Sequence, residues 1–373
     1  MSGNKLIPMI LILSILLSGC GTASTEQNEA ASVLLSEADT NEPEYEIIST
    51  PYGNLANNAK NVWDLCIFDG SLYIGAGDYD VNISPANAYR YDLTDERFYT
   101  CGAIPDEQID RFCVIKGSLY IPGCDPTGDW SKGNYYLLEN GVFKTYRNIP
   151  YAVHCFDITE YDGKLFAATG LTEANESFPV SVSTDGGISF VSVKAERKSE
   201  NHTFNRRVYK LFKHEDELYA LNGSDLYRYD GDCFVFEASW QNRLVGGYPF
   251  YTQIAESAYF NGRTYFTTGY LFHFEDAKNL QYTVFENAIV TDLAVYGERL
   301  YVLCAKPLDN GNYLICLTVS DDGSNFKTIK AIEYGLPALS FALNDNELYL
   351  GIGDVGQSNI ELKGNILKTE VLE

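Results

Sequence analysis

Hydrophobic and polar residues alternate in short runs along most of the chain, and the runs are separated by Gly, Asp and Asn. In one representative unit, runs at 62–68 and 71–76 flank the turn Asp69-Gly70, and two further runs follow at 88–91 and 97–101. A period of two residues with β-branched and aromatic side chains is typical of half-buried strands. The pattern therefore predicts an all-β chain built from units of four short antiparallel strands.

The same turn, followed by a hydrophobic-aromatic pair, recurs seven times, with successive aromatic residues 36 to 53 residues apart. The pairs are Leu72-Tyr73, Leu119-Tyr120, Leu165-Phe166, Leu218-Tyr219, Thr264-Tyr265, Leu300-Tyr301 and Leu348-Tyr349. Four strands at this period are the pattern of a β-propeller blade, and blades must stack into a ring to bury both faces. We therefore predict a seven-bladed β-propeller, with six blades as the alternative.

The last unit is one strand short, since runs at 338–343, 347–352 and 364–369 are followed by almost no chain. The segment 45–49 precedes the first unit and has the pattern of a strand. We expect this N-terminal strand to become the fourth strand of the last blade and to close the ring. The propeller domain would then span residues 44–373.

The N-terminus has the composition of a targeting segment. Lys5 precedes an apolar run at 6–17 that is too short to span a bilayer comfortably, and this run leads into Leu17-Ser18-Gly19-Cys20. The last four residues resemble the bacterial lipobox. That resemblance implies a signal peptide at 1–19, a lipid on Cys20, and a location on the bacterial cell membrane facing the extracytoplasmic side. Residues 20–43 are polar and aperiodic, which predicts a flexible tether.

Two turns carry a more specific motif. The strings STDGGISF at 183–190 and SDDGSNF at 320–326 resemble the Asp-box, or BNR repeat, of sialidase-like and kelch-like propellers. In that family the box ties the hairpin between the third and fourth strands of a blade. Sialidases also carry a Phe/Tyr-Arg-Ile-Pro motif. The string at 146–150 departs from it by one inserted residue, so sialidase activity is not expected.

Aligning the units on the hydrophobic-aromatic pair shows a polar residue eight positions before its first member in every unit. These residues are Asp64, Arg111, Asp157, Lys210, Glu256, Asp292 and Ser340. They lie on the strand expected to be innermost, next to the central channel. Opposite charges about 6 Å apart attract by roughly 3 kcal/mol at an effective dielectric of about 20. A purely structural ring and a ligand site at the channel mouth both fit this pattern.

A second alignment separates three units from the rest. Asp78, Asp125 and Asp354 lie six positions after the leucine in units one, two and seven, which are consecutive in a closed ring. Charged loops on a rigid scaffold are common places for function. We predict a polar ligand site over blades one to three, with the residues Trp63, Asp64, Asp78, Arg111, Asp125, Trp130, His154, Asp157 and Asp354.

Composition limits the choice of partners. The chain has 51 acidic and 27 basic residues and a net charge of −24, so nucleic acid is not an expected partner. We expect no cofactor, although clustered aspartates offer the oxygen ligands that Ca²⁺ accepts. Four scattered His residues do not have zinc-ligand spacing. Cys304 and Cys316 flank one hairpin and are candidates for a disulfide in an exported protein.

Three functions remain open at this point. The first is a monomeric, surface-anchored propeller that binds an extracellular glycan or another small polar ligand, with the lipid as its contact to the membrane. The second is a glycosidase or lyase that uses two carboxylates from Asp64, Asp78, Asp125 and Asp157. The third is a protein-interaction scaffold of the cell envelope.

Overall fold

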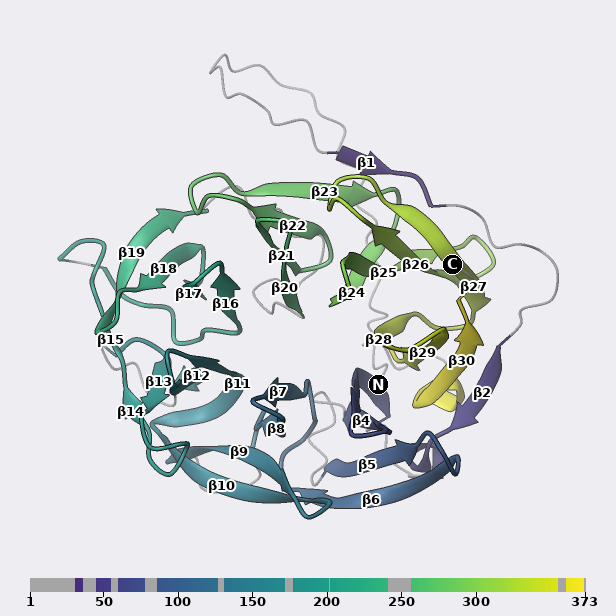
Figure 1. The fold of residues 1–373 in the computed structure, drawn as a ribbon, viewed down its shortest axis with the longest axis horizontal. Coiled ribbons are helices and arrows are strands. Elements are labelled where there is room, and N and C mark those ends of the chain that lie inside the picture. The colour runs from purple at the N-terminus through teal and green to yellow at the C-terminus, as the bar shows by residue number, and fades with distance from the viewer. Residues whose placement is uncertain are drawn as a thin grey trace, which may run out of the picture.

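The computed structural model describes residues 31–35, 45–54, 60–77, 86–126, 131–171, 177–200, 202–240, 256–354 and 360–371. These residues form seven sheets arranged in a ring, which Figure 1 shows viewed down its shortest axis. The seven-bladed propeller predicted from the repeats is confirmed. The described part of the chain contains no helix that is long and apolar enough to span a membrane.

The first three blades each contain four antiparallel strands. Blade one consists of β3 (Asn61–Phe68), β4 (Ser71–Gly77), β5 (Ala86–Asp92) and β6 (Arg97–Ile104). Blade two consists of β7 (Cys113–Ile115), β8 (Ser118–Pro122), β9 (Lys132–Glu139) and β10 (Val142–Pro150). Blade three consists of β11 (Ala152–Tyr161), β12 (Lys164–Leu171), β13 (Val180–Ser183) and β14 (Val191–Ser192).

Blades four and five each gain a fifth, parallel strand on their outer edge. Blade four consists of β16 (Leu211–His214), β17 (Glu217–Asn222), β18 (Asp225–Tyr229) and β19 (Cys233–Ser239), with β15 (Lys194–Ala195) beside β19. Blade five consists of β20 (Ser257–Phe260), β21 (Arg263–Thr267), β22 (Leu271–Phe274) and β23 (Gln281–Phe285), with β1 (Ala31–Val33) beside β23.

The last two blades complete the ring. Blade six consists of β24 (Ile289–Tyr296), β25 (Arg299–Pro307), β26 (Tyr313–Ser320) and β27 (Lys327–Tyr334). Blade seven consists of β28 (Ala338–Asn344), β29 (Glu347–Ile352) and β30 (Asn365–Glu370), with β2 (Glu46–Ser49) as its outer strand. Within the described part of the chain, two short 3-10 helices accompany the sheets, η1 (Pro51–Asn54) and η2 (Ile360–Leu362).

The N-terminal strand closes the ring as expected. Antiparallel pairing joins β2 to β30 over four residue pairs, from Glu46 with Lys368 to Ser49 with Asn365. The two ends of the domain therefore share one sheet. Residues 31–35, which belong to the segment predicted as a tether, lie along blade five, where Val33 and Leu35 pack against its hydrophobic core.

The repeated turns explain why the inner two strands of each blade recur so regularly. At Asp69-Gly70 both residues have positive φ, and the same holds for Lys116-Gly117, Asp162-Gly163 and Asn261-Gly262. Two consecutive residues with positive φ are the geometry of a type I′ hairpin turn, which favours Gly and Asn. The second residue after each of these turns is buried, as Leu72 is.

The core is divided among the junctions of the blades. The described residues form seven hydrophobic clusters, and each joins side chains from two neighbouring blades. At the junction of blades seven and one, for example, Tyr349 and Ile366 pack against Leu65 and Ile74. Stability therefore depends on each blade having a neighbour on both sides.

Both Asp-box motifs lie where the sequence places them, directly after the third strand of a blade. In the first box, the hydroxyl of Ser183 donates to Asp185 at 2.7 Å, and Asp185 accepts from the backbone N–H of Ser189 at 2.9 Å. These contacts, led by those from Ser189, lower the pKa of Asp185 to about 2. In the second box, Asp322 accepts the backbone N–H groups of Ser324 and Asn325, both at 2.8 Å.

Candidate functional site

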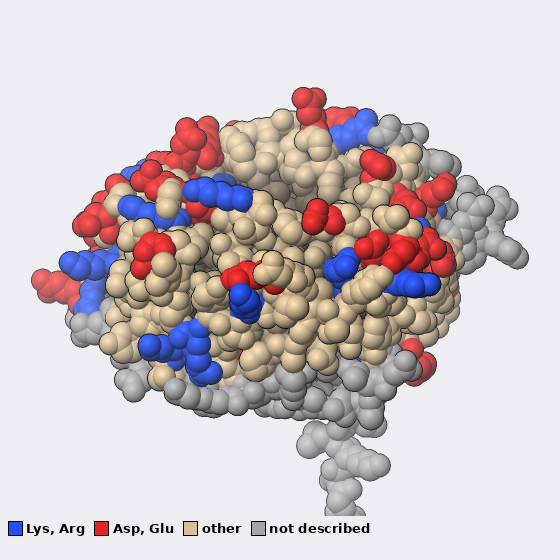
Figure 2. Space-filling view, turned by 60° about the horizontal axis from the view of Figure 1, so that its bottom comes forward, with Lys and Arg blue, Asp and Glu red and all other residues tan. Residues whose placement is uncertain are grey.

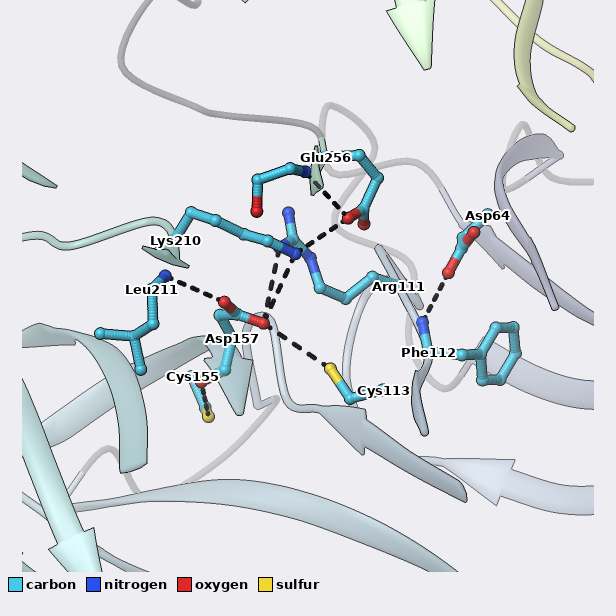
Figure 3. Close-up of polar contacts among 10 residues, drawn as sticks. Asp64, Arg111, Phe112, Cys113, Cys155, Asp157, Lys210, Leu211 and Glu256 are labelled. Atoms are coloured by element: carbon cyan, nitrogen blue, oxygen red, sulfur yellow. Dashed lines mark hydrogen bonds and ion pairs between the residues drawn. The ribbon is translucent and has the colours of Figure 1, made fainter. Parts of the chain in front are cut away.

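The seven aligned polar residues meet at the central channel, and we call them the channel ring. They are Asp64, Arg111, Asp157, Lys210, Glu256, Asp292 and Ser340. Ion pairs connect four of them, as Figure 3 shows. The ammonium of Lys210 lies 2.9 Å from Glu256 and 3.7 Å from Asp157, and the guanidinium of Arg111 lies 3.6 Å from Asp157.

The ring aspartates also tie one blade to the next. Each accepts the backbone N–H of the residue that follows the ring position of the neighbouring blade. Asp64 accepts from Phe112 at 2.6 Å, Asp157 from Leu211 at 3.0 Å and Asp292 from Phe341 at 3.0 Å. Together with the ion pairs and the bond from the Ser340 hydroxyl to Val62, these ties bridge six of the seven junctions in the described structure. The channel ring therefore has a structural role, since its side chains hold neighbouring blades together at the centre of the propeller.

Local backbone geometry divides the ring into two classes. In blades one, three, six and seven, a register shift one residue before the ring position marks a β-bulge. The bulge re-aims the following side chain, and these blades carry Asp or Ser at the ring position. In blades two, four and five, the inner strand begins only after Arg111, Lys210 or Glu256. The longer side chains thus belong to the blades with shorter inner strands.

The channel changes how its carboxyl groups ionise. Burial, reinforced by the negative charge of Glu256, raises the pKa of Asp64 to about 7, although Phe112 and Arg111 act in the opposite direction. Burial raises the pKa of Asp292 well above its usual value, again with Glu256 contributing. The ring contains four acids and two bases. Protonation of Asp64 and Asp292 would bring these charges into balance near neutral pH.

A pocket of about 420 Å³ opens at the mouth of the channel that carries the turns between the inner two strands. Residues of blades two to five line it, and Asp157 and Lys210 of the channel ring lie among them. Lys116, Glu160, Lys213 and Tyr259 also contribute to its walls. In the space-filling view of Figure 2 the molecule is hollowed near the centre of the ring, with acidic and basic side chains interspersed over the described surface.

Tyr259 and Val114 give this pocket apolar surface. The ring of Tyr259 is 42% exposed and makes an edge contact with His214 of the adjacent blade, with 5.5 Å between the ring centroids. Val114 is 55% exposed. The prediction from sequence did not include Lys213 or Tyr259. Both lie three positions after the channel ring in their units, so the same alignment that found the ring could have found them.

The predicted site residues divide between two ends of the channel. Asp64, Arg111 and Asp157 belong to the channel ring. Trp63, Asp125, His154 and Asp354 lie toward the opposite mouth, where the second strand of each blade ends. Asp78 and Trp130 lie outside the described residues, so the predicted grouping of Asp78, Asp125 and Asp354 stays a prediction. Cys20 and the predicted signal peptide also lie outside them.

One pair at that opposite mouth interacts. His154 donates a hydrogen bond from Nδ1 to the backbone carbonyl of Cys124 and interacts electrostatically with Asp125. Burial raises the pKa of Asp125, while His154 and Arg207 oppose that rise. Arg207, which the sequence did not single out, lies 5.8 Å from the ring centroid of Phe156. Sequence alone gave no signal for this residue, because it lies before the aligned part of its unit.

The glycines of the aspartate motifs have a packing role. A Cβ on Gly77 would come within 2.3 Å of Gln108, and one on Gly353 within 2.9 Å of the Asn61 side chain. Trp63 donates from Nε1 to the carbonyl of Gly77 at 2.8 Å, and the Asp354 N–H donates to Asn61 at 2.9 Å. The Trp63 contact lies within blade one, whereas the Asn61 contacts join blade seven to blade one, so close packing within and between blades fixes these positions.

No group of three or more His, Cys, Asp or Glu among the described residues is arranged to hold a metal ion. Cys304 and Cys316 are direct partners in the register of β25 and β26, and both are buried. Each is a free thiol in the structure. The two candidate cysteines therefore lie opposite each other on neighbouring strands, without a bond between them.

Comparison with known proteins extends the picture of the fold. No family model and no curated protein matches the chain. A catalytically inactive histidine variant of virginiamycin B lyase from Staphylococcus aureus, solved with quinupristin, matches with a TM-score of 0.54 and 11% identity. The match covers 88% of this chain and 100% of the other. The selenomethionine-substituted form of that lyase matches equally well, at 10% identity and with the same coverage.

A third solved structure has a different kind of role. BBS1N in complex with ARL6DN, soaked with lead, matches with a TM-score of 0.50 and 10% identity over 84% of this chain and 94% of the other. In all, 433 chains match in shape. Since the neighbours include both a lyase and a protein bound to a partner, the likeness shows the seven-bladed fold and does not select a function.

Proposed function

We propose that the chain is a lipid-anchored propeller of the bacterial cell envelope that binds an extracellular glycan in the pocket at the turn-bearing mouth of the channel. The observation that carries this proposal is the pocket itself. Its volume of about 420 Å³ falls within the range of roughly 300–1,000 Å³ that is typical of small-molecule sites. Its walls combine an exposed tyrosine ring with carboxylate and ammonium groups.

Those walls suit a sugar. A pyranose presents an apolar C–H face and a rim of hydroxyl groups. Tyr259 offers a flat apolar surface for the first, and Glu160 and Lys116 offer an acceptor and a donor for the second. Asp157 and Lys210 of the channel ring also line the pocket, and both are held in place by ion pairs and by contacts between blades. Side chains that are already fixed lower the entropic cost of binding.

A screen of the full chain, purified in detergent, on a panel of oligosaccharides tests this function. Sugars that bind are incubated with the protein and assayed for released products. Binding without product release supports a binding module. Release of product that is lost in Asp64→Asn supports the alternative, a glycosidase or lyase. The raised pKa of about 7 at the buried Asp64, a common property of catalytic carboxyl groups, favours that alternative over a scaffold.

A further inference from the structure

The residues three positions after the channel ring divide the channel mouth into two parts. Blades three, four and five carry polar side chains there, which we call the polar arc: Glu160, Lys213 and Tyr259. The other four blades carry aliphatic side chains, which we call the apolar arc: Val295, Leu343, Ile67 and Val114. Val295, Leu343 and Ile67 pack against the hydrophobic clusters of the blade junctions. The pocket accordingly opens over the polar arc.

The three lysines that line this pocket differ in their partners. Lys116 lies 3.3 Å from Glu160, and Lys210 lies 2.9 Å from Glu256. Lys213 is exposed, and no carboxylate among the described residues forms an ion pair with it. Its ammonium is therefore available to a ligand at the rim of the pocket.

The side chains that line the pocket carry one more positive than negative charge. The lining contains three lysines against Asp157 and Glu160, whereas the chain carries a net charge of −24. Backbone hydrogen bonding from Gly163, with help from Lys116 and Lys213, lowers the pKa of Glu160, so this carboxylate stays ionised. An anion entering the mouth would meet its most favourable contact at Lys213, while its hydroxyl groups could donate to Glu160.

We infer that the ligand of this pocket is a saccharide that carries a carboxylate, such as a uronic acid unit. This inference rests on the proposed function, since it names the class of glycan that the same pocket takes. Lys213 contacts the carboxylate, Tyr259 packs against the C–H face of the ring, and Val114 closes the opposite side. A neutral sugar of the same size would offer the ammonium of Lys213 no anionic partner.

The test uses matched pairs of sugars with the purified full chain. Trisaccharides of galacturonic acid and glucuronic acid are compared with the neutral trisaccharides of galactose and glucose by isothermal titration calorimetry. We expect the acidic member of at least one pair to bind at least tenfold more tightly than its neutral counterpart. We also expect that preference to weaken at high salt, because exposed charges are screened.

Single substitutions show which side chains cause the preference for acidic sugars. Lys213→Ala is expected to lower the affinity for the acidic sugar about tenfold, and Lys213→Arg to retain it. Lys327→Ala removes an exposed lysine from the outer strand β27 and should leave the affinity unchanged. Equal binding of acidic and neutral sugars would overturn the acidic-ligand inference and leave glycan binding intact. Binding of no sugar on the panel would overturn both, and so would binding that ignores both Lys213→Ala and Tyr259→Ala.

Discussion

The carboxylate of Asp157 in blade three accepts the backbone N–H of Leu211 in blade four at 3.0 Å, and the same carboxylate pairs with Arg111 and Lys210. A single side chain thus joins blades two, three and four at the centre of the ring. Only 3% of Asp157 is exposed, so these partners replace water almost completely. Loss of the carboxylate would leave the N–H of Leu211 without its acceptor and would remove an ion-pair partner from both Arg111 and Lys210.

Substitution of Asp157 should therefore be strongly destabilising. We expect Asp157→Ala to lower the free energy of unfolding by about 3–5 kcal/mol, the range for breaking a buried ion pair. Asp157→Asn should cost less, because its amide oxygen can still accept from Leu211. Urea denaturation measures both changes. Asp309→Ala, in an exposed hairpin loop, is the control and should stay within about 0.5 kcal/mol of the wild type. Similar values for Asp157→Ala and Asp309→Ala would contradict the conclusion that the Asp157 carboxylate stabilises the protein by joining three blades.

The raised pKa of Asp64 predicts a dependence of stability on pH. The folded protein holds a proton on this carboxyl up to about pH 7, whereas the ordinary value for the unfolded chain is 3.8. Between these values the folded state binds more protons than the unfolded state, so this group's contribution to stability falls as the pH rises. Above pH 7 the contribution no longer changes.

Comparison with Asp64→Asn isolates that contribution, since other buried carboxyl groups such as Glu107 titrate in the same range. The stability difference between wild type and variant, measured by urea denaturation from pH 4 to pH 8, should move in favour of the variant as the pH rises to 7. A difference that is constant over this range would show that Asp64 titrates normally.

The ring closure predicts unequal effects of two deletions. Deletion of residues 44–50 removes β2, which completes blade seven and joins the two ends of the domain. Deletion of residues 21–40 removes β1, which adds three residue pairs outside a blade that already has four strands. We therefore expect the first deletion to lower the thermal midpoint far more than the second. Equal midpoints would mean that the pairing of β2 with β30 does not stabilise the ring.

The Asp-box glycines predict a contrast among glycines with positive φ. Gly187 and Gly323 each accept a hydrogen bond at their carbonyl from a tyrosine of the preceding blade, Tyr135 at 2.9 Å and Tyr265 at 3.1 Å. A Cβ on these glycines would come within 2.5 Å and 2.0 Å of the same hydroxyl groups. Gly297 also has positive φ, but a Cβ there would meet nothing within 4 Å.

Gly187→Ala and Gly323→Ala should therefore destabilise the protein by more than Gly297→Ala, which has only the backbone cost of about 1 kcal/mol. Denaturant midpoints of the three variants provide the comparison. If Gly297→Ala were as destabilising as the other two, the clash with the tyrosine hydroxyl groups would make no contribution to the loss of stability.

The fold was predictable because its determinants are local and repeated. Every blade except blade five places a leucine two residues after a tight turn, as Leu72 and Leu348 show. The Asp-boxes mark the ends of third strands. Closure of the ring by the N-terminal strand was predictable because the last unit lacked one strand. The short strand β1 was not predictable, since Ala31–Val33 has no alternation and depends on an edge of blade five that is distant in sequence.

The site was predictable only in part. Sequence alignment found the channel ring, but it could not show that Asp64 and Asp157 accept backbone N–H groups from the next blade, because such contacts depend on how the blades stack. It also directed attention to loops at the opposite mouth from the pocket. The same alignment places polar residues at Glu160, Lys213 and Tyr259 and aliphatic residues at the equivalent positions of the other four blades. Only the structure shows that these polar side chains border a cavity.

The central claim is that the pocket at the turn-bearing mouth binds a glycan, and Tyr259 tests it most directly. The affinity of the tightest sugar on the panel is measured for wild type, Tyr259→Ala and Tyr99→Ala, where Tyr99 is a similarly exposed tyrosine on the outer strand β6. Loss of stacking on an aromatic ring is worth about 1 kcal/mol or more, which is fivefold or more in affinity. We predict that loss for Tyr259→Ala and wild-type affinity for Tyr99→Ala. Equal affinity in all three proteins would contradict the claim.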